Sequence, residues 1–333
     1  MKINDNIIYY SSQCGKYTIP HDKETGKQIY NLPPQRVLQP YELIMSKDSI
    51  KSFKEKKKKD EEFENNKKKG FVHQGRGIQN PLGQLRHSTL HYLIKLYPLF
   101  RYDGDPILIN GKKANSTALI EYLKLGTTAG SQLLNELVDK EVLKVIKGKG
   151  NTKYYGSTGK FVIKGQLKDK DSWTVKVFQE KLQEIINNVE KEIKNHPEKE
   201  NIELYPLAVL AAVIPFFHFQ TFFLCKNYDE DILKGQEEGI LKVMKQSPTI
   251  IKHLPKITLW RLATGKVTKK MNQAQRRKLD IYFEILCKAG AINYWNGRKT
   301  LILINPDLVF VSNKIKDDSW YEAVTFLFEQ ANP

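Results

Sequence analysis

The side chains best suited to specific chemistry gather in two short stretches. The first stretch has hydroxyl and amide groups spaced to share one side of a helix, namely Thr127, Thr128, Ser131, Gln132 and Asn135. The second combines amides with arginines, namely Asn272, Gln273, Gln275, Arg276 and Arg277. Such groups form hydrogen bonds with base edges, Asn or Gln with adenine and Arg with guanine. Both stretches therefore predict contacts with the bases of double-stranded DNA.

Cationic side chains follow each stretch. Lys147, Lys149 and Lys153 come after the first, and Arg298 and Lys299 come after the second. Lysine and arginine bind backbone phosphates whatever the base sequence, so they add affinity rather than selectivity. A run of charge is often only a solvated face. Within 266–299, however, nine cationic residues stand against two acidic ones, and we expect them to meet phosphates.

The elements predicted for residues 115–156 must position the first set. Apolar residues at helical spacing predict two successive helices, with Leu119, Ile120, Leu123 and Leu125 in one and Leu133, Leu134, Leu137 and Val138 in the other. Between them, LGTTAG predicts a turn with Gly126 as a left-handed cap and Thr127 or Thr128 as the next N-cap. VLKVI and TKYYG then flank a glycine-rich turn, which predicts a β-hairpin.

The order helix, turn, helix, hairpin resembles the winged-helix variant of the helix-turn-helix over about 40 residues. The resemblance implies that the second helix enters a major groove and that the hairpin, the wing, meets phosphates. Units of this kind also serve as protein-binding modules. A wing with a purely structural role is therefore an open alternative.

An internal repeat predicts a second unit. LIKLYPLFRY (93–102) aligns with LAAVIPFFHF (210–219), and LVDKEVLKV (137–145) aligns with LCKAGAINY (286–294). The offset grows from 117 to 149, so the second copy holds about 32 additional residues. A repeated supersecondary unit predicts a repeated fold. The expected elements are helices over 206–221, 235–246, 257–263 and 272–288, then a hairpin that turns at Asn296–Gly297.

The uncharged segment 204–225 has two possible interpretations. It is long enough to span a bilayer. Its two prolines and the pair His218 and Gln220 argue against a membrane span, and the repeat instead predicts a buried first helix. We therefore favour the buried helix and expect no membrane partner, with a membrane-associated protein as an alternative.

The chain is expected to divide into four parts. Residues 51–69 are rich in lysine and glutamate, which predicts either a plain tether or a non-specific DNA-binding arm. The amphipathic stripe of a helix over 172–195 packs either on its own domain or on a second copy of the chain. The fold class is mainly α with small β-hairpins (α+β), with two winged-helix domains in tandem joined by a helix. The parts are a basic flexible N-terminal segment and linker (1–70), a winged-helix domain (71–170), a linker helix (171–203) and a second winged-helix domain with an insertion (204–333).

Composition favours an anionic partner. The 333 residues include 54 lysines and arginines against 37 acidic residues, a net charge of +17. An AT-rich genome would explain a preference for lysine, but not the excess of basic over acidic residues. Cys14, Cys225 and Cys287 are too widely spaced for a disulfide framework or a zinc motif, which predicts a reducing compartment. The N-terminus lacks the apolar core of a signal peptide, so we expect a cytoplasmic location.

Catalytic motifs are missing from the sequence. It has no P-loop and no G-x-G-x-x-G after a strand. His87 and His91 lie four residues apart without the glutamate of H-E-x-x-H, which predicts surface histidines rather than a metal site. Asp103 and Asp105 lack the partner carboxylates of a two-metal nuclease. We therefore expect no catalytic residue, no metal and no cofactor, and a chain that binds rather than an enzyme.

Tandem winged helices of this total length are similar to the replication initiators of plasmids and phages, across roughly residues 71–315. The resemblance implies binding to repeated or two-part sites at an origin, often with repression of the protein's own promoter. We therefore expect a sequence-specific double-stranded DNA-binding protein, either an initiator or a transcription regulator, with a homodimer as a further partner. The alternative is a protein-interaction module in a replication or partition complex.

Overall fold

The computed structural model divides the chain into two compact units, Met1–Asn66 and Lys67–Pro333. Helices and short strands are mixed, which is compatible with the expected α+β class. The described residues are 7–11, 17–28, 35–36, 70–75, 85–165, 174–233, 239–247, 249–295, 301–310 and 318–331.

The first unit contains one small antiparallel sheet in the order β1-β2-β3. At the end of β2, the Asp22 carboxylate accepts hydrogen bonds from the backbone N–H groups of Thr25 (2.7 Å) and Glu24 (3.1 Å), which closes a turn. The lysine-rich segment 51–69 lies outside the described residues. The strands are β1 (Ile7–Ser11), β2 (Tyr17–Asp22) and β3 (Gln35–Arg36).

A four-stranded antiparallel sheet joins the two halves of the second unit, in the order β13-β10-β4-β9. The inner strands pair so that His73 lies opposite Lys176, at the middle of both strands. Each inner strand also pairs with its own edge strand, His73 with Ile163 and Lys176 with Phe310. The halves of the sheet are thus related by a local two-fold arrangement. The strands are β4 (Phe71–Gly75), β9 (Val162–Ile163), β10 (Thr174–Phe178) and β13 (Val309–Phe310).

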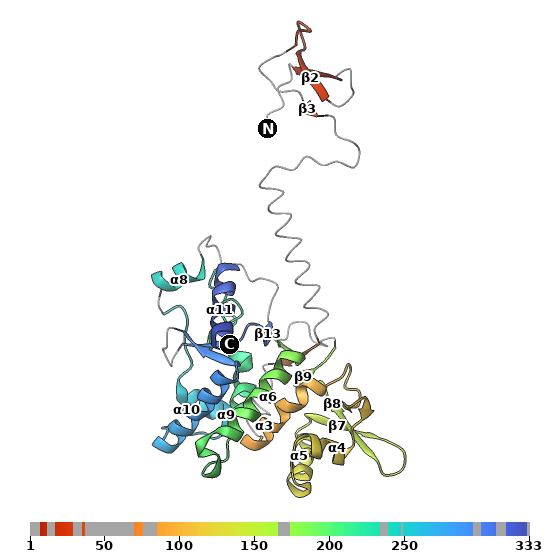
Figure 1. Cartoon of the computed structure of the whole chain (residues 1–333), viewed down its shortest axis with the longest axis vertical. Helices are drawn as coiled ribbons and strands as arrows, with labels where there is room; N and C mark the ends of the chain where they lie inside the picture. The colour runs from red at the N-terminus through yellow and green to blue at the C-terminus, as the bar shows by residue number, and fades with distance from the viewer. Residues whose placement is uncertain are drawn as a thin grey trace. The chain divides into compact units, whose positions relative to one another are not determined.

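Two equivalent helices pack against each other beneath this sheet (Figure 1). They are α3 (His87–Leu96), which continues into η2 (Tyr97–Leu99), and α7 (Pro206–Val213), which continues into η4 (Ile214–Phe216). Pro98 and Pro215 occupy the same place in the two 3-10 turns, which confirms the predicted alignment.

The burial of α7 explains the uncharged segment 204–225. Every residue of α7 is buried, and the chain turns back after η4 so that Phe217 bridges to Leu224. The helix expected over 206–221 was therefore too long, because Pro215 ends the regular part. None of the described helices is both long and apolar enough to cross a bilayer.

The helices and the hairpin predicted for residues 115–156 are confirmed. Asn115 caps α4 by accepting a hydrogen bond from Ala118 N (2.9 Å). The turn prediction was wrong: Lys124, not Gly126, has the left-handed backbone (φ 56°), and Gly126 is the extended N-cap of α5. Helix α4 ends at Tyr122, so Gly126 lies beyond its C-terminus and serves as the N-cap of α5. The elements are β5 (Leu108–Ile109), β6 (Lys112–Lys113), α4 (Ser116–Tyr122), α5 (Thr127–Asp139), β7 (Leu143–Lys147) and β8 (Lys153–Ser157).

The second half repeats this order. After α5, Val142 N donates to Leu137 O; after α10, Ala291 N donates to Leu286 O, at the predicted offset of 149. The residues just before, Glu141 (φ 55°) and Gly290 (φ 74°), are both left-handed. The Asn296–Gly297 turn lies outside the described residues. The elements are α8 (Ile240–Gln246), α9 (Lys256–Thr264), α10 (Gln273–Lys288), β11 (Ile292–Tyr294) and β12 (Ile302–Ile304).

The helix expected over 172–195 begins later than predicted. Residues 174–178 form β10, because Val175 and Val177 alternate with outward residues and β4 supplies a partner strand. The helix itself is α6 (Gln179–Asn195), followed by η3 (Pro197–Glu200). Its apolar stripe is buried within the same chain, chiefly against η2, α7 and α10. Near the C-terminus, α11 (Asp318–Ala331) buries Trp320 and Val324.

Gly130 fixes the close approach of α4 and α5. A Cβ atom at this position would overlap the side chain of Ile120. We expect Gly130→Val to lower the free energy of unfolding by about 1–3 kcal/mol, because helix α5 would be forced off α4. Urea denaturation measures the change. The exposed neighbour Ser131→Ala is the control and should stay within about 0.5 kcal/mol; an equal effect of the two variants would contradict the close-packing explanation.

Candidate nucleic-acid interface

Helix α5 presents its polar predicted residues to solvent. Its buried side consists of Gly130, Leu133, Leu134 and Leu137. The opposite side is a row of exposed hydroxyl and amide groups, called here the α5 polar row: Thr127, Thr128, Ser131, Gln132 and Asn135. In Figure 1 this helix lies at the lower edge of the second unit. The row can donate and accept hydrogen bonds with an external ligand.

The N-terminus of α5 is open. Its N-cap, Gly126, offers no side-chain hydrogen bond, and the first turn has no acidic residue. The prediction of Thr127 or Thr128 as N-cap was therefore wrong, since both lie inside the helix. The first backbone N–H groups of α5 have no partner within the helix, and together with the helix dipole they favour an anion.

The hairpin β7–β8, called here the wing, contacts α5 through strand β7 and carries the predicted lysines at its far end. Lys147, Lys149 and Lys153 are all exposed. Lys147 and Lys153 face each other as the last pair of the ladder, where like charges repel. A phosphate oxygen between two such ammonium groups would relieve that repulsion.

Glu136 holds α5 against α3. Its carboxylate accepts hydrogen bonds from the backbone N–H (2.9 Å) and Nε (2.6 Å) of Arg86 and from Oγ1 of Thr89 (2.7 Å). This contact could not be expected from the sequence, because Glu136 lies 50 residues from Arg86. Arg86 is the N-cap residue of α3 and makes no side-chain cap hydrogen bond, and Glu136 accepts its backbone N–H. Burial raises the pKa of the Glu136 carboxyl, but the hydrogen bonds and charge from Arg86 and Thr89 outweigh it and lower the pKa overall.

We expect Glu136→Gln to lower the free energy of unfolding by about 1–2 kcal/mol at pH 7, a figure discounted for partial exposure. The folded pKa lies below the unfolded value of about 4.5, so this stability is present above the unfolded pKa and is lost as the pH falls through the folded pKa. Urea denaturation from pH 7 to pH 3 measures the difference. A difference that stays constant below pH 4 would contradict a stabilising role of the Glu136 charge, and Glu121→Gln at an exposed position of α4 is the matched control.

His87 and His91 are not the surface histidines that the sequence predicted. His91 is 5% exposed, and its ring meets Tyr92 and Tyr205 edge-on at centroid distances of 5.2 and 5.5 Å. The His87 ring lies 5.4 Å from that of Tyr282. Burial, with help from Lys278 and Lys266, lowers the pKa of His87 to about 4, so this ring is neutral at pH 7.

The predicted residues of the second stretch have divided roles. Asn272 Oδ1 accepts from Gln275 N (2.8 Å), and Gln275 Oε1 accepts from Asn272 N (3.0 Å), which is a capping box. Both amides are thus engaged with the backbone of α10. Gln273 and Arg276 are exposed, and exposed Arg277 forms an ion pair with Glu198 of η3. Arg298 and Lys299 lie outside the described residues.

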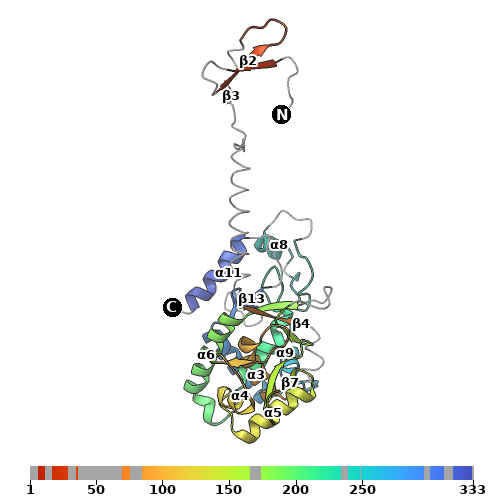
Figure 2. The same cartoon turned by 90° about the vertical axis from the view of Figure 1, so that its right-hand side faces the viewer.

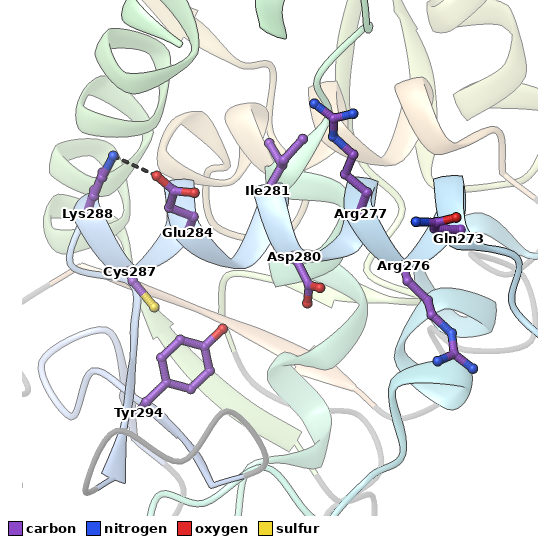
Figure 3. Close-up of a pocket in the computed structure, with 9 residues that line it drawn as sticks. All are labelled: Gln273, Arg276, Arg277, Asp280, Ile281, Glu284, Cys287, Lys288 and Tyr294. Atoms are coloured by element: carbon purple, nitrogen blue, oxygen red, sulfur yellow. Dashed lines mark hydrogen bonds and ion pairs between the residues drawn. The ribbon is translucent and has the colours of Figure 1, made fainter. Parts of the chain in front are cut away.

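A groove of about 720 Å³ follows the side of α10. Figure 3 shows Arg276, Asp280 and Cys287 pointing to one side of the helix, with the Tyr294 hydroxyl turned towards Cys287. Both acidic and basic side chains line it, so this face has no uniform charge.

The described residues contain no group of three or more His, Cys, Asp or Glu side chains placed to hold a metal ion. Among them, the α5 polar row and the wing offer neutral hydrogen-bonding groups and cations without an ion pair. Comparisons with protein-family models, with curated proteins and with solved structures found no match for this chain.

Proposed function

We propose that this chain binds double-stranded DNA at specific sequences through the α5 polar row and the wing, as a replication initiator or a transcription regulator. The observation that carries the proposal is the exposed row on α5 beside an open helix N-terminus and facing lysines. Neutral hydrogen-bonding groups select bases, whereas cations and helix N-termini bind phosphates.

The dimensions of α5 suit a major groove. A helix with its side chains is about 10–12 Å wide, and the groove of B-DNA is about 12 Å wide. The 13 residues of α5 span about 20 Å, enough to cross the groove while its N-terminus approaches the backbone. On this proposal the helices and hairpins act as winged-helix units, with the wing over neighbouring phosphates.

The second half of the unit extends the proposed contact. In Figure 1, α5 and α10 lie on opposite sides of the α3 and α6 pair. Figure 2 shows the same unit from the side, with α5 again at the lower edge. Two DNA-contacting units on one chain make the second contact intramolecular, which raises affinity through effective concentration. A site at an origin or promoter that is longer than the contact of α5 alone suits such a chain.

We propose that the chain acts by binding rather than by catalysis, and in the cytoplasm. The thiols of Cys225 and Cys287 are free, which suits a reducing compartment. Burial raises the pKa of Cys225 to about 12, so its thiol is protonated and unreactive at neutral pH.

Selection of bound fragments from a random duplex library at about 0.15 M salt tests the proposal. We expect one enriched motif, because the α5 polar row contributes selectivity that survives screening of surface charge. The map position of that motif, at an origin or at promoters, then separates initiator from regulator. If all binding is lost at this salt and no motif is enriched, the positive charge of the chain acts only non-specifically. That result would reject the proposal and favour a protein partner.

A further inference from the structure

Helices α5 and α10 occupy equivalent places but present different faces. The hydrogen bonds that end both helices fix the offset at 149 residues. This offset also matches buried Leu133 and Leu134 of α5 with buried Tyr282 and Phe283 of α10. The outward positions can therefore be compared one by one. Ser131, Gln132 and Asn135 of the α5 polar row correspond to Asp280, Ile281 and Glu284 of α10.

The outward face of α10 is poorly suited to base edges. Asp280 forms an ion pair with Lys256, and Glu284 forms one with Lys288 (2.8 Å). Ile281 is only 8% exposed, whereas its counterpart Gln132 is exposed. Figure 3 shows these acidic side chains along the groove. A carboxylate can accept a hydrogen bond from cytosine, but here it would have to leave its lysine and approach phosphates of like charge.

An additional element also flanks α10. Helix α6 and turn η3 come between β10 and α7, and they pack beside α10. Glu198 of η3 holds Arg277 at the start of α10. In the first half only residues 76–86 separate β4 from α3. Helix α10 is therefore less accessible along its length than α5.

The start of α10 and the preceding turn are basic, in contrast to the acidic side chains farther along the helix. Residues 265–277, called here the basic turn, contain five cationic residues and no acidic one. Lys266, Lys269, Lys270 and Arg276 are exposed. Val267, at 93% exposure, shows how far this turn stands out into solvent. Cations on a protruding turn meet phosphates, which carry no sequence information.

We infer that the two halves of the second unit make different contacts with DNA. Helix α5 contacts base edges, and the basic turn binds the backbone phosphates of the adjoining duplex whatever its sequence. This inference rests on the proposed function, since it concerns the same DNA ligand. The ligand is then a duplex with one sequence-specific part and a flank of arbitrary sequence. The flank extends about one helical turn, roughly 10 bp, beyond the specific part.

The test uses the full chain and the motif obtained by selection. Duplexes carry the motif alone or the motif extended by roughly 10 bp of several unrelated sequences. We expect the extension to raise affinity by about tenfold or more, equally for every flank, because only phosphates are added. In Lys269→Gln/Lys270→Gln this gain is expected to disappear, while the selected motif stays the same. The matched control, Lys226→Gln/Lys245→Gln, removes the same charge from exposed positions elsewhere and should keep the gain.

Three results would overturn the inference. They are a second block of selected bases about one helical turn from the first, a gain that depends on the flank sequence, and a motif that changes in Lys269→Gln/Lys270→Gln. Each would make α10 a second reading helix. Failure of the proposed function gives a different result, since the unaltered chain would then select no motif at all.

Discussion

Replacing Ser131, Gln132 and Asn135 together by alanine is expected to lower affinity for the selected DNA site by about 10³-fold. A good base contact contributes about 1–3 kcal/mol of discrimination, and three contacts of about 1.4 kcal/mol each amount to about 4 kcal/mol, a factor of about 10³. All three side chains are exposed on α5, so their loss removes contacts without disturbing the core. Binding to an unrelated duplex is expected to change by less than about twofold, because the phosphate contacts are kept. Anisotropy titrations of both duplexes at one salt concentration measure the two affinities.

The matched control for this variant lies on α8. Gln246 and Ser247 are exposed polar residues at the end of that helix, so Gln246→Ala/Ser247→Ala removes similar groups far from α5 in Figure 1. We expect it to bind both duplexes like the unaltered chain. An equal loss on both duplexes by the α5 variant would mean that the polar row contributes only general affinity. No loss on either would remove α5 from the interface.

Helices with a strong apolar period could be predicted from the sequence. Leu133, Leu134 and Leu137 form the buried side of α5, as their spacing indicates, and α10 begins within one residue of its predicted start. These features are local, because the same side chains define the helix and its buried face. The repeat could also be found, since Pro98 and Pro215 mark the same turn in both copies.

Strands and long-range contacts were harder to predict. β10 has only five residues. Its alternating pattern becomes a stable strand only through pairing with β4, which lies about 100 residues earlier in the chain. The burial of His87 and His91 likewise depends on aromatic rings from α9, α10 and the start of α7. Nothing in the segment around these histidines indicates such partners.

The candidate site shows a different limit. Asn272 and Gln275 have the residue types of base-reading side chains, yet they also have the spacing of a capping box, which is what they form. That spacing was visible in the sequence and could have identified their role. The ion pair of Asp280 was not visible, because its partner Lys256 lies on a separate helix. The pair of Glu284 and Lys288 has i,i+4 spacing on α10 and could have been predicted.

Replacing Lys147, Lys149 and Lys153 by glutamine is expected to weaken binding to every duplex by on the order of 10- to 100-fold at about 0.15 M salt. Each phosphate contact contributes about 0.9 to the slope of log affinity against log salt, so the slope should fall by about 2.7. The preferred motif is expected to stay the same, because on the proposed function the lysines of the wing contact the backbone rather than base edges. Titrations of the selected and unrelated duplexes over a series of salt concentrations measure both quantities.

The wing variant and the α5 variant should differ in which DNA affinity they reduce and not only in how much they reduce it. The wing variant should reduce specific and non-specific affinity by the same factor, whereas the α5 variant should reduce only the specific one. Lys191→Gln/Lys226→Gln/Lys245→Gln removes the same charge from exposed positions outside the wing and controls for net charge. If that control lowers the slope of log affinity against log salt as much, the lysines act through the overall electrostatic field of the protein. The facing pair Lys147 and Lys153 would then form no specific phosphate site. A changed motif would instead mean that the wing itself contacts bases.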